Sequence, residues 1–104
     1  MDNGMIAPDG STGFSFGAAL SYMQEGRLVR RQGWNGKGMH IAMAGGYPRG
    51  VLASMDAARC MGAELGDEIK VRPYIVMKDA QGFMVCGWLA SQTDMLADDW
   101  EVVE

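Results

Sequence analysis

Two glycine-containing turns, each placed between short apolar runs, constrain the fold of this chain most. The first turn contains the Asn35-Gly36 pair, and the second is DAQG (79–82). An Asn-Gly pair between two strand-like runs is typical of a β-hairpin, although this connection is longer than the two-residue form. The strands predicted on either side of the two turns are residues 27–30, 38–45, 69–79 and 83–89. Pro73 has no N–H to donate, so it is expected at a sheet edge or a bulge.

Three segments have helical patterns. Phe16, Ala19, Leu20 and Met23 follow the spacing of an amphipathic helix over 16–25, with Ser15 as N-cap and Gly26 as the left-handed residue after it. The other predicted elements are a loop at 46–50, a helix within 51–62 that stops at Gly62, a helix at 92–97 capped by Ser91 and Asp94, and a strand at 99–103. Alternating strand–helix–strand units are absent. The prediction is an α+β fold: a small antiparallel sheet of four to five strands with two to three short helices.

The length of 104 residues fits one domain. We expect a flexible N-terminal arm at 1–12, rich in Gly, Pro, Asp and Ser, followed by a single α+β ligand-binding domain over 13–104. Within it, residues 45–68 are interpreted as a variable insert.

Charge and composition exclude several functions. The net charge of −4 argues against binding of a nucleic-acid polymer, which requires many neutralised phosphates, but permits a small phosphorylated ligand. Basic residues gather at 27–37 and acidic residues at 94–104, which we interpret as two solvated faces able to pair across strands. No apolar run of 18 residues and no signal sequence occurs, so no membrane association is expected. Cys60 and Cys86 are expected to be buried free thiols, and no metal site is predicted.

No catalytic set is recognisable. His40 is the only histidine, neighbouring carboxylates such as Asp98 and Asp99 point apart, and no phosphate-binding loop motif occurs. The sequence therefore predicts a protein that is not an enzyme and needs no cofactor.

Binding chemistry is present instead. The glycine-flanked turn can expose N–H groups to an anion, with Arg30, Arg31 and Lys37 beside it. Trp34 and Trp88 could stack on a base or simply pack in the core. The segment SQTD (91–94) could bind an anion at a helix start or serve only as its cap.

Three segments carry a family resemblance: FSFGAALSYMQEGRLVRRQGWNGKGM (14–39), RPYIVMKDAQG (72–82) and WLASQTDMLADDWEVV (88–103). Together they resemble a small phage and prophage family, some of whose members are known as the second family of Thoeris anti-defence proteins. The resemblance does not extend to 45–68, and the N-terminal arm is longer than usual.

The resemblance implies a cytoplasmic protein of the infected bacterial host that sequesters cyclic nucleotide immune messengers without cleaving them. The implied ligands are cyclised ADP-ribose isomers and, at a separate site in some members, cyclic dinucleotides; the implied assembly is a homotetramer with pockets between subunits. The matching positions, expected to bind ligand, are Arg31, Gly33, Trp34, Asn35, Gly36, Lys37, Trp88, Ser91, Gln92, Thr93 and Asp94. The alternatives are a small phosphodiesterase or hydrolase acting on the same messengers, and a structural phage assembly protein.

Overall fold

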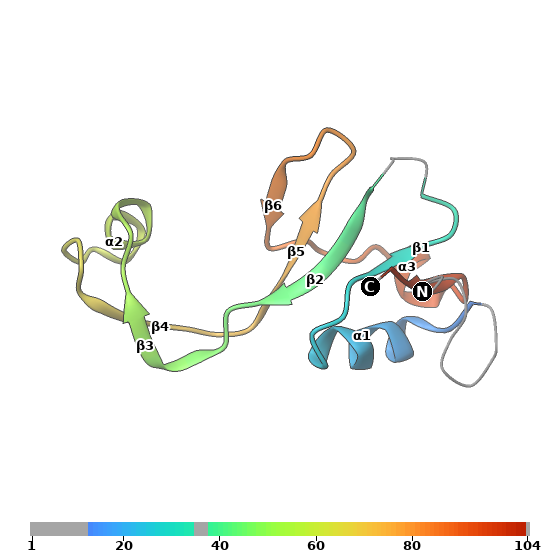
Figure 1. Cartoon of the computed structure of the whole chain (residues 1–104), viewed down its shortest axis with the longest axis horizontal. Coiled ribbons are helices and arrows are strands. Elements are labelled where there is room, and N and C mark those ends of the chain that lie inside the picture. The colour runs from blue at the N-terminus through green and yellow to red at the C-terminus, as the bar shows by residue number, and fades with distance from the viewer. Residues whose placement is uncertain (1–12, 35–37, 104) are drawn as a thin grey trace. The chain divides into compact units, whose positions relative to one another are not determined.

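The computed structural model of the chain describes residues 13–34 and 38–103 (Figure 1). Contacts divide the chain into two compact units. We call residues 1–43 with 75–104 the main unit, and residues 44–74 the small unit. The segment expected to be an insert, 45–68, lies within the small unit. The expected N-terminal arm, 1–12, lies outside the described residues.

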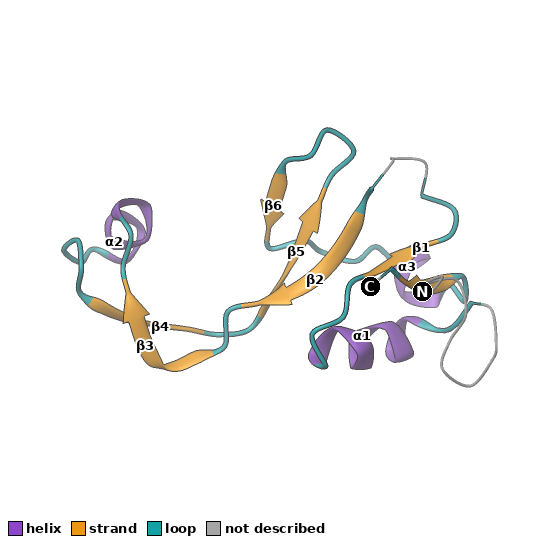
Figure 2. Cartoon of the chain, in the orientation of Figure 1, coloured by secondary structure: helices purple, strands orange, loops and turns teal. Residues whose placement is uncertain are grey.

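The main sheet has five strands in the order β6-β5-β2-β1-β7 (Figure 2). Its strands are β1 (Val29–Arg31), β2 (His40–Ala44), β5 (Tyr74–Lys78), β6 (Met84–Cys86) and β7 (Trp100–Val102). Both predicted hairpins form, because β1 pairs antiparallel with β2 and β5 with β6. Helices α1 (Phe16–Gln24) and α3 (Gln92–Leu96) complete the unit. The α+β prediction is confirmed.

Helix α1 supplies one side of the core. The Ser15 hydroxyl accepts a hydrogen bond from the Ala18 N–H at 3.2 Å, and Gly26, at φ +88°, follows the end of the helix, as predicted. The fully or almost fully buried apolar side chains of the main unit, among the described residues, are Ala19, Met23, Val29, Ile41, Trp100 and Val102. Full burial of a large apolar side chain contributes about 1.5–3 kcal/mol, so this small set provides much of the unit's stability.

The small unit contains a two-stranded sheet, β3 (Tyr47–Leu52) and β4 (Glu68–Val71), joined through helix α2 (Met55–Met61). The prediction of a loop at 46–50 is therefore wrong. Antiparallel pairing with β4 holds this glycine- and proline-containing segment as a strand, and its register shifts between Tyr47 and Val51, where Gly50 adopts φ +98°. Gly62 ends α2 in the left-handed conformation, as expected.

The prediction of one strand over 69–79 is also wrong in one respect. The segment forms two strands, β4 and β5, which belong to different sheets. Residues 72 and 73 lie between β4 and β5, and Pro73 cannot continue a ladder because it lacks an N–H. Gly45, in the connection between β2 and β3, lies against residues 72 and 74. A Cβ added to Gly45 would lie 2.5 Å from the Arg72 carbonyl oxygen. Only glycine fits this approach at φ +78°.

The basic and acidic segments do pair across strands. Arg30 lies opposite Glu101 on β1 and β7, and its Nε donates to Glu101 Oε2 at 2.6 Å. Glu101 is only 1% exposed, and its other oxygen, Oε1, has no hydrogen-bond partner among the described residues. By contrast, the expectation of buried thiols is wrong: Cys60 and Cys86 are both exposed, Cys86 because it lies on β6 at the edge of the sheet.

Candidate functional site

The two predicted halves of the site meet within the main unit. One half follows β1, from Arg31 to Trp34, and the other runs from Trp88 into the start of α3. The link between them is made by Asp99 and Trp100, which were not among the predicted site residues. Asn35, Gly36 and Lys37 lie outside the described residues, so their placement stays a prediction.

The start of α3 is held by a capping box. Ser91 Oγ accepts a hydrogen bond from the Asp94 N–H at 3.1 Å, and Asp94 Oδ2 accepts from the Ser91 N–H at 3.1 Å. The Ser91 hydroxyl also donates to Asp94 Oδ2 at 2.9 Å. These bonds confirm the predicted cap and engage both side chains in the fold itself.

Gln92 and Thr93 differ from the two capping residues. Both are exposed, and neither side chain hydrogen-bonds to the rest of the described chain. Their amide and hydroxyl groups are therefore available to a ligand at the start of α3.

Arg31 bridges the two halves. Its Nη1 donates to Asp94 Oδ1 at 3.0 Å and its Nε donates to Asp99 Oδ1 at 2.9 Å. The side chain is 19% exposed, so this ion-paired triad is largely shielded from solvent. Arg31 thus fixes α3 against the end of β1, and in this arrangement its charge is already balanced by two carboxylates. Gly33 lies beside the same group: a Cβ there would be 3.5 Å from Asp99 Oδ2.

The triad changes the protonation equilibria of its members. Hydrogen bonds to Asp99 and then to Asp94 raise the pKa of Arg31 above its usual value. Burial acts to raise the pKa of Asp94, but the hydrogen bonds from Ser91 and Arg31 outweigh it, and the pKa of Asp94 lies below its usual value.

We expect the Asp94 carboxylate to stabilise the fold in a pH-dependent way. A depressed folded-state pKa gives stability that is complete above the unfolded value of about 4 and lost as the pH falls through the folded value. Asp94→Asn should therefore cost about 1 kcal/mol at pH 7, through loss of the cap and the ion pair, and progressively less below about pH 4. Urea unfolding at pH 7, 4 and 3 measures this difference. Asp98→Asn, an exposed control, should follow the wild-type pH profile; an Asp94→Asn deficit that persists at pH 3 would contradict the expectation.

Three tryptophans form the centre of the site. Trp100 is fully buried, and its indole N–H donates to the Asp94 carbonyl oxygen at 3.0 Å. Trp34 and Trp88 pack edge-on against it, with ring centroids 5.4 and 6.5 Å away, and lie 6.2 Å from each other. Both outer indoles are only half-buried. Both pack against the core and keep part of their ring surface exposed, and their stacking on a base stays a prediction.

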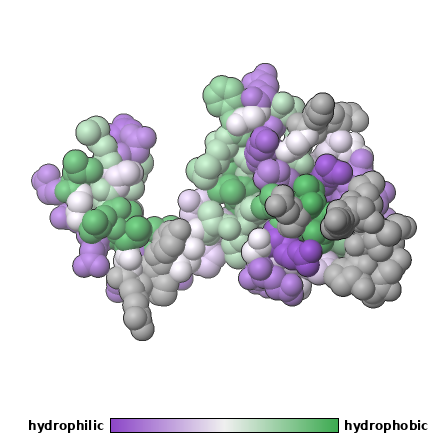
Figure 3. Space-filling view, viewed as in Figure 1, coloured by the Kyte–Doolittle hydropathy of each residue, from purple (hydrophilic) through white to green (hydrophobic). Residues whose placement is uncertain are grey.

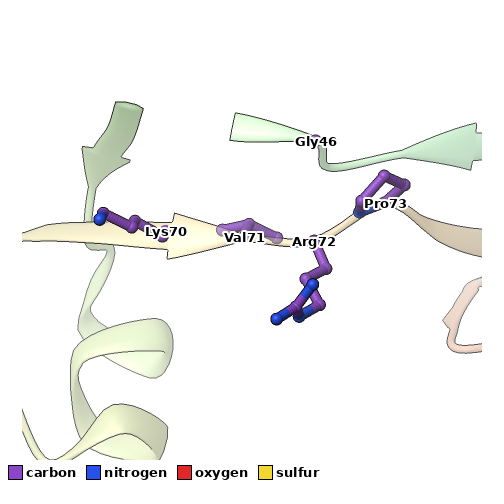
Figure 4. Close-up of a pocket in the computed structure, with 5 residues that line it drawn as sticks. All are labelled: Gly46, Lys70, Val71, Arg72 and Pro73. Atoms are coloured by element: carbon purple, nitrogen blue, oxygen red, sulfur yellow. The ribbon is translucent and has the colours of Figure 1, made fainter. Parts of the chain in front are cut away.

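A separate hollow lies within the small unit. It has a volume of about 470 Å³ and is lined by Gly46, Lys70, Val71, Arg72 and Pro73 (Figure 4). Lys70 and Arg72 give it a positive charge, but their side chains extend in different directions from the strand. Convergent polar groups are the mark of a built ligand site, and they are not found here.

Other chemistry is sparse in the described ranges. No group of three or more His, Cys, Asp or Glu residues there is placed to hold a metal ion. The lone His40 lies within hydrogen-bond distance of the Gly38 carbonyl oxygen, 3.1 Å from its Nδ1. None of the helices in the described part of the chain is long and apolar enough to cross a membrane.

The fold and the site together define a class of small α+β domains in which a hairpin motif and a helix-start motif meet on one buried tryptophan. Residues 14–103 match the Thoeris anti-defense 2-like domain, and the chain belongs to this family. It is similar to Thoeris anti-defense 2 of Bacillus phage SP01, with 38% identity over 96 residues that cover 88% of this chain and 97% of the relative. The resemblance drawn from the sequence is thereby confirmed, and membership supports a phage anti-defence role.

Proposed function

We propose that this protein binds cyclic nucleotide immune messengers and sequesters them without cleavage, so that bacterial defence effectors are not activated. Cyclised ADP-ribose isomers are the first ligand class, with cyclic dinucleotides as a second. The protein acts in the cytoplasm of the infected bacterial host, as a homo-oligomer and by family resemblance a homotetramer.

One observation carries the proposal: two half-buried indoles lie next to a helix start whose cap is already complete. Trp34 and Trp88 offer apolar ring surface for a base, a contact worth about 1–3 kcal/mol. Gln92 and Thr93 offer hydrogen bonds to ribose or base from the adjacent helix start. Because Arg31 is ion-paired with both Asp94 and Asp99, we assign these three side chains to holding the helix start and the hairpin together rather than to acting as general acid or base.

Sequestration requires tight binding, and nanomolar affinity corresponds to about −12 kcal/mol. An open turn of one chain offers too little enclosed surface for this, which favours a pocket completed by a second subunit. The proposed assembly follows from that requirement as well as from the family.

The rival functions make different predictions in one experiment. The protein is mixed with cyclised ADP-ribose isomers or cyclic dinucleotides, then heat-denatured, and the released nucleotide is analysed by mass spectrometry. Intact messenger supports sequestration, whereas degraded messenger supports a phosphodiesterase or hydrolase. A ligand at 100-fold excess over its dissociation constant adds about 2.7 kcal/mol of stability, so a thermal-shift screen without stabilisation supports a structural assembly protein.

We expect Gln92→Ala/Thr93→Ala to weaken messenger binding about 10-fold or more, because each lost hydrogen bond costs about 0.5–1.5 kcal/mol. The melting temperature without ligand should barely change, since both side chains are exposed and unbonded within the described chain. Isothermal calorimetry measures the affinity. Ser21→Ala/Gln24→Ala, on the exposed side of α1, is the matched control and should bind as wild type. Equal affinities for the two variants would place the ligand elsewhere.

A further inference from the structure

The small unit leaves most of its apolar side chains uncovered. Its described buried apolar residues are two alanines, Ala53 and Ala58. The large apolar residues that remain between 60% and 72% exposed are Leu52, Met55, Met61 and Leu65. In Figure 3, hydrophobic residues of this unit reach the surface between charged ones.

Helix α2 has an apolar side that its own sheet covers only in part. Met55, Ala58 and Met61 follow one another every three residues, so they lie along one side of the helix. Ala58 is 4% exposed, yet both methionines beside it are exposed. The polar Asp56 and Arg59 pair with each other at 3.4 Å, and Arg59, four residues after Met55, lies beside it on the helix surface. The two exposed methionines flank the buried Ala58, and with it they form an apolar stripe along the helix rather than scattered surface residues.

By its own contacts the small unit is poorly stabilised. It has 31 residues between Ala44 and Tyr74, and a two-stranded sheet alone is marginal in water. Units below about 40 residues usually need a disulfide, a metal or association with another chain. Cys60 is a free thiol, and the described residues contain no metal-binding group. Packing against other protein surface is the remaining source of stability.

Charge indicates which partner fits. The small unit has four acidic residues (Asp56, Glu64, Asp67, Glu68) and four basic ones (Arg49, Arg59, Lys70, Arg72), so it is neutral, and the net charge of −4 belongs to the main unit. Two copies can therefore meet through their small units without electrostatic repulsion between the two contact surfaces. A lipid surface fits less well, because membrane-surface helices carry several Lys or Arg, whereas α2 has one Arg balanced by one Asp.

We propose that the small unit is a contact surface between two copies of this chain, centred on Met55 and Met61 of α2 and continued by Leu65. It rests on the homo-oligomer of the proposed function and names one contact surface of that oligomer, separate from the contact that completes the ligand pocket. A two-fold contact brings the same stripe from both copies together, and flexible methionine side chains suit such self-complementary packing.

Native mass spectrometry and sedimentation test the surface. The variant Met55→Glu/Met61→Lys keeps the net charge and changes exposed positions only, and we expect its assembly to have half the wild-type mass or less. The matched control, Phe83→Glu/Met84→Lys, changes two main-unit residues that are 67% and 63% exposed and lie outside the candidate site, and it should keep the wild-type mass. The wild-type mass should also persist in 1 M NaCl, because an apolar contact is not screened by salt. Circular dichroism checks that both variants are folded, and Leu65→Gln, outside α2, provides a second disruption of the stripe.

The inference is overturned if the α2 variant keeps the wild-type mass, if only the control dissociates, or if 1 M NaCl dissociates the wild type. If the wild-type protein is monomeric but still binds and releases intact messenger, the proposed contact surface is wrong and sequestration is retained. A wild type that assembles through α2 yet stabilises with no messenger would overturn sequestration and leave the surface standing.

Discussion

Trp100→Ala is expected to lower the free energy of unfolding by about 3–5 kcal/mol, the usual cost of removing a buried aromatic ring. Trp100 is fully buried and packs against the rings of Phe16, Trp34 and Trp88. Its indole N–H also donates a hydrogen bond to the Asp94 carbonyl oxygen. For a domain near 100 residues each kcal/mol shifts the melting temperature by about 4–8 °C, so a fall of about 15–30 °C should be seen. Thermal melting followed by far-UV circular dichroism measures it.

The half-buried Trp88 is the comparison for this result. Trp88→Ala opens no closed cavity, so it should cost less than half as much as Trp100→Ala. Trp100→Phe retains most of the ring packing and loses the hydrogen bond to Asp94, which should cost about 1 kcal/mol. If Trp88→Ala is as destabilising as Trp100→Ala, the buried indole is not the centre of the cluster.

Arg30→Met is expected to destabilise the protein by about 3 kcal/mol, because it leaves the Glu101 carboxylate buried without its cation. Glu101 is 1% exposed, its Oε2 accepts from Arg30 Nε at 2.6 Å, and its Oε1 has no hydrogen-bond partner in the described ranges. Urea unfolding of wild type and variant at neutral pH measures the difference.

The double variant Arg30→Met/Glu101→Met is the matched comparison for the single one. Replacing a buried ion pair by apolar residues is often neutral or stabilising, so the double variant should return to within about 1 kcal/mol of wild type. A cost below about 1 kcal/mol for Arg30→Met alone would mean that water reaches Glu101 when the cation is removed.

The fold was predictable where local chemistry determines it. The Ser15 and Ser91 caps, the ends of α1 and α2 at glycine, and both hairpins depend on neighbouring residues, and all are confirmed. The two-stranded sheet of the small unit was not predictable, because its strands form only through pairing between segments about 20 residues apart. Residues 46–50 have the composition of a loop and become a strand through β4, and Pro73 separates two strands that read as one.

The local elements of the candidate site, the hairpin and the capped helix start, were predictable from the sequence. The side-chain contacts that join them were not. Asp99 and Trp100 lie in the segment 88–103 that resembles the family, but the residues of this segment that are predicted to bind ligand end at Asp94. Nothing local indicates that Asp99 pairs with Arg31, because the two are brought together by the β1–β7 pairing. In the sequence alone, Arg31 is a cation that could bind an anionic ligand. In the fold it forms ion pairs with Asp94 and Asp99, so it holds the two halves of the candidate site together.

The pairing of β1 with β7 also determines when the site can exist during protein synthesis. β7 follows every other described element in the sequence, and it supplies the indole on which Trp34 and Trp88 rest. The ribosome must therefore release β7 before the hairpin and α3 can be joined, and the closure of so long a loop makes this a slow, late step of folding. A nascent chain that has already formed α1 and the first hairpin still lacks the buried indole against which Trp34 and Trp88 pack.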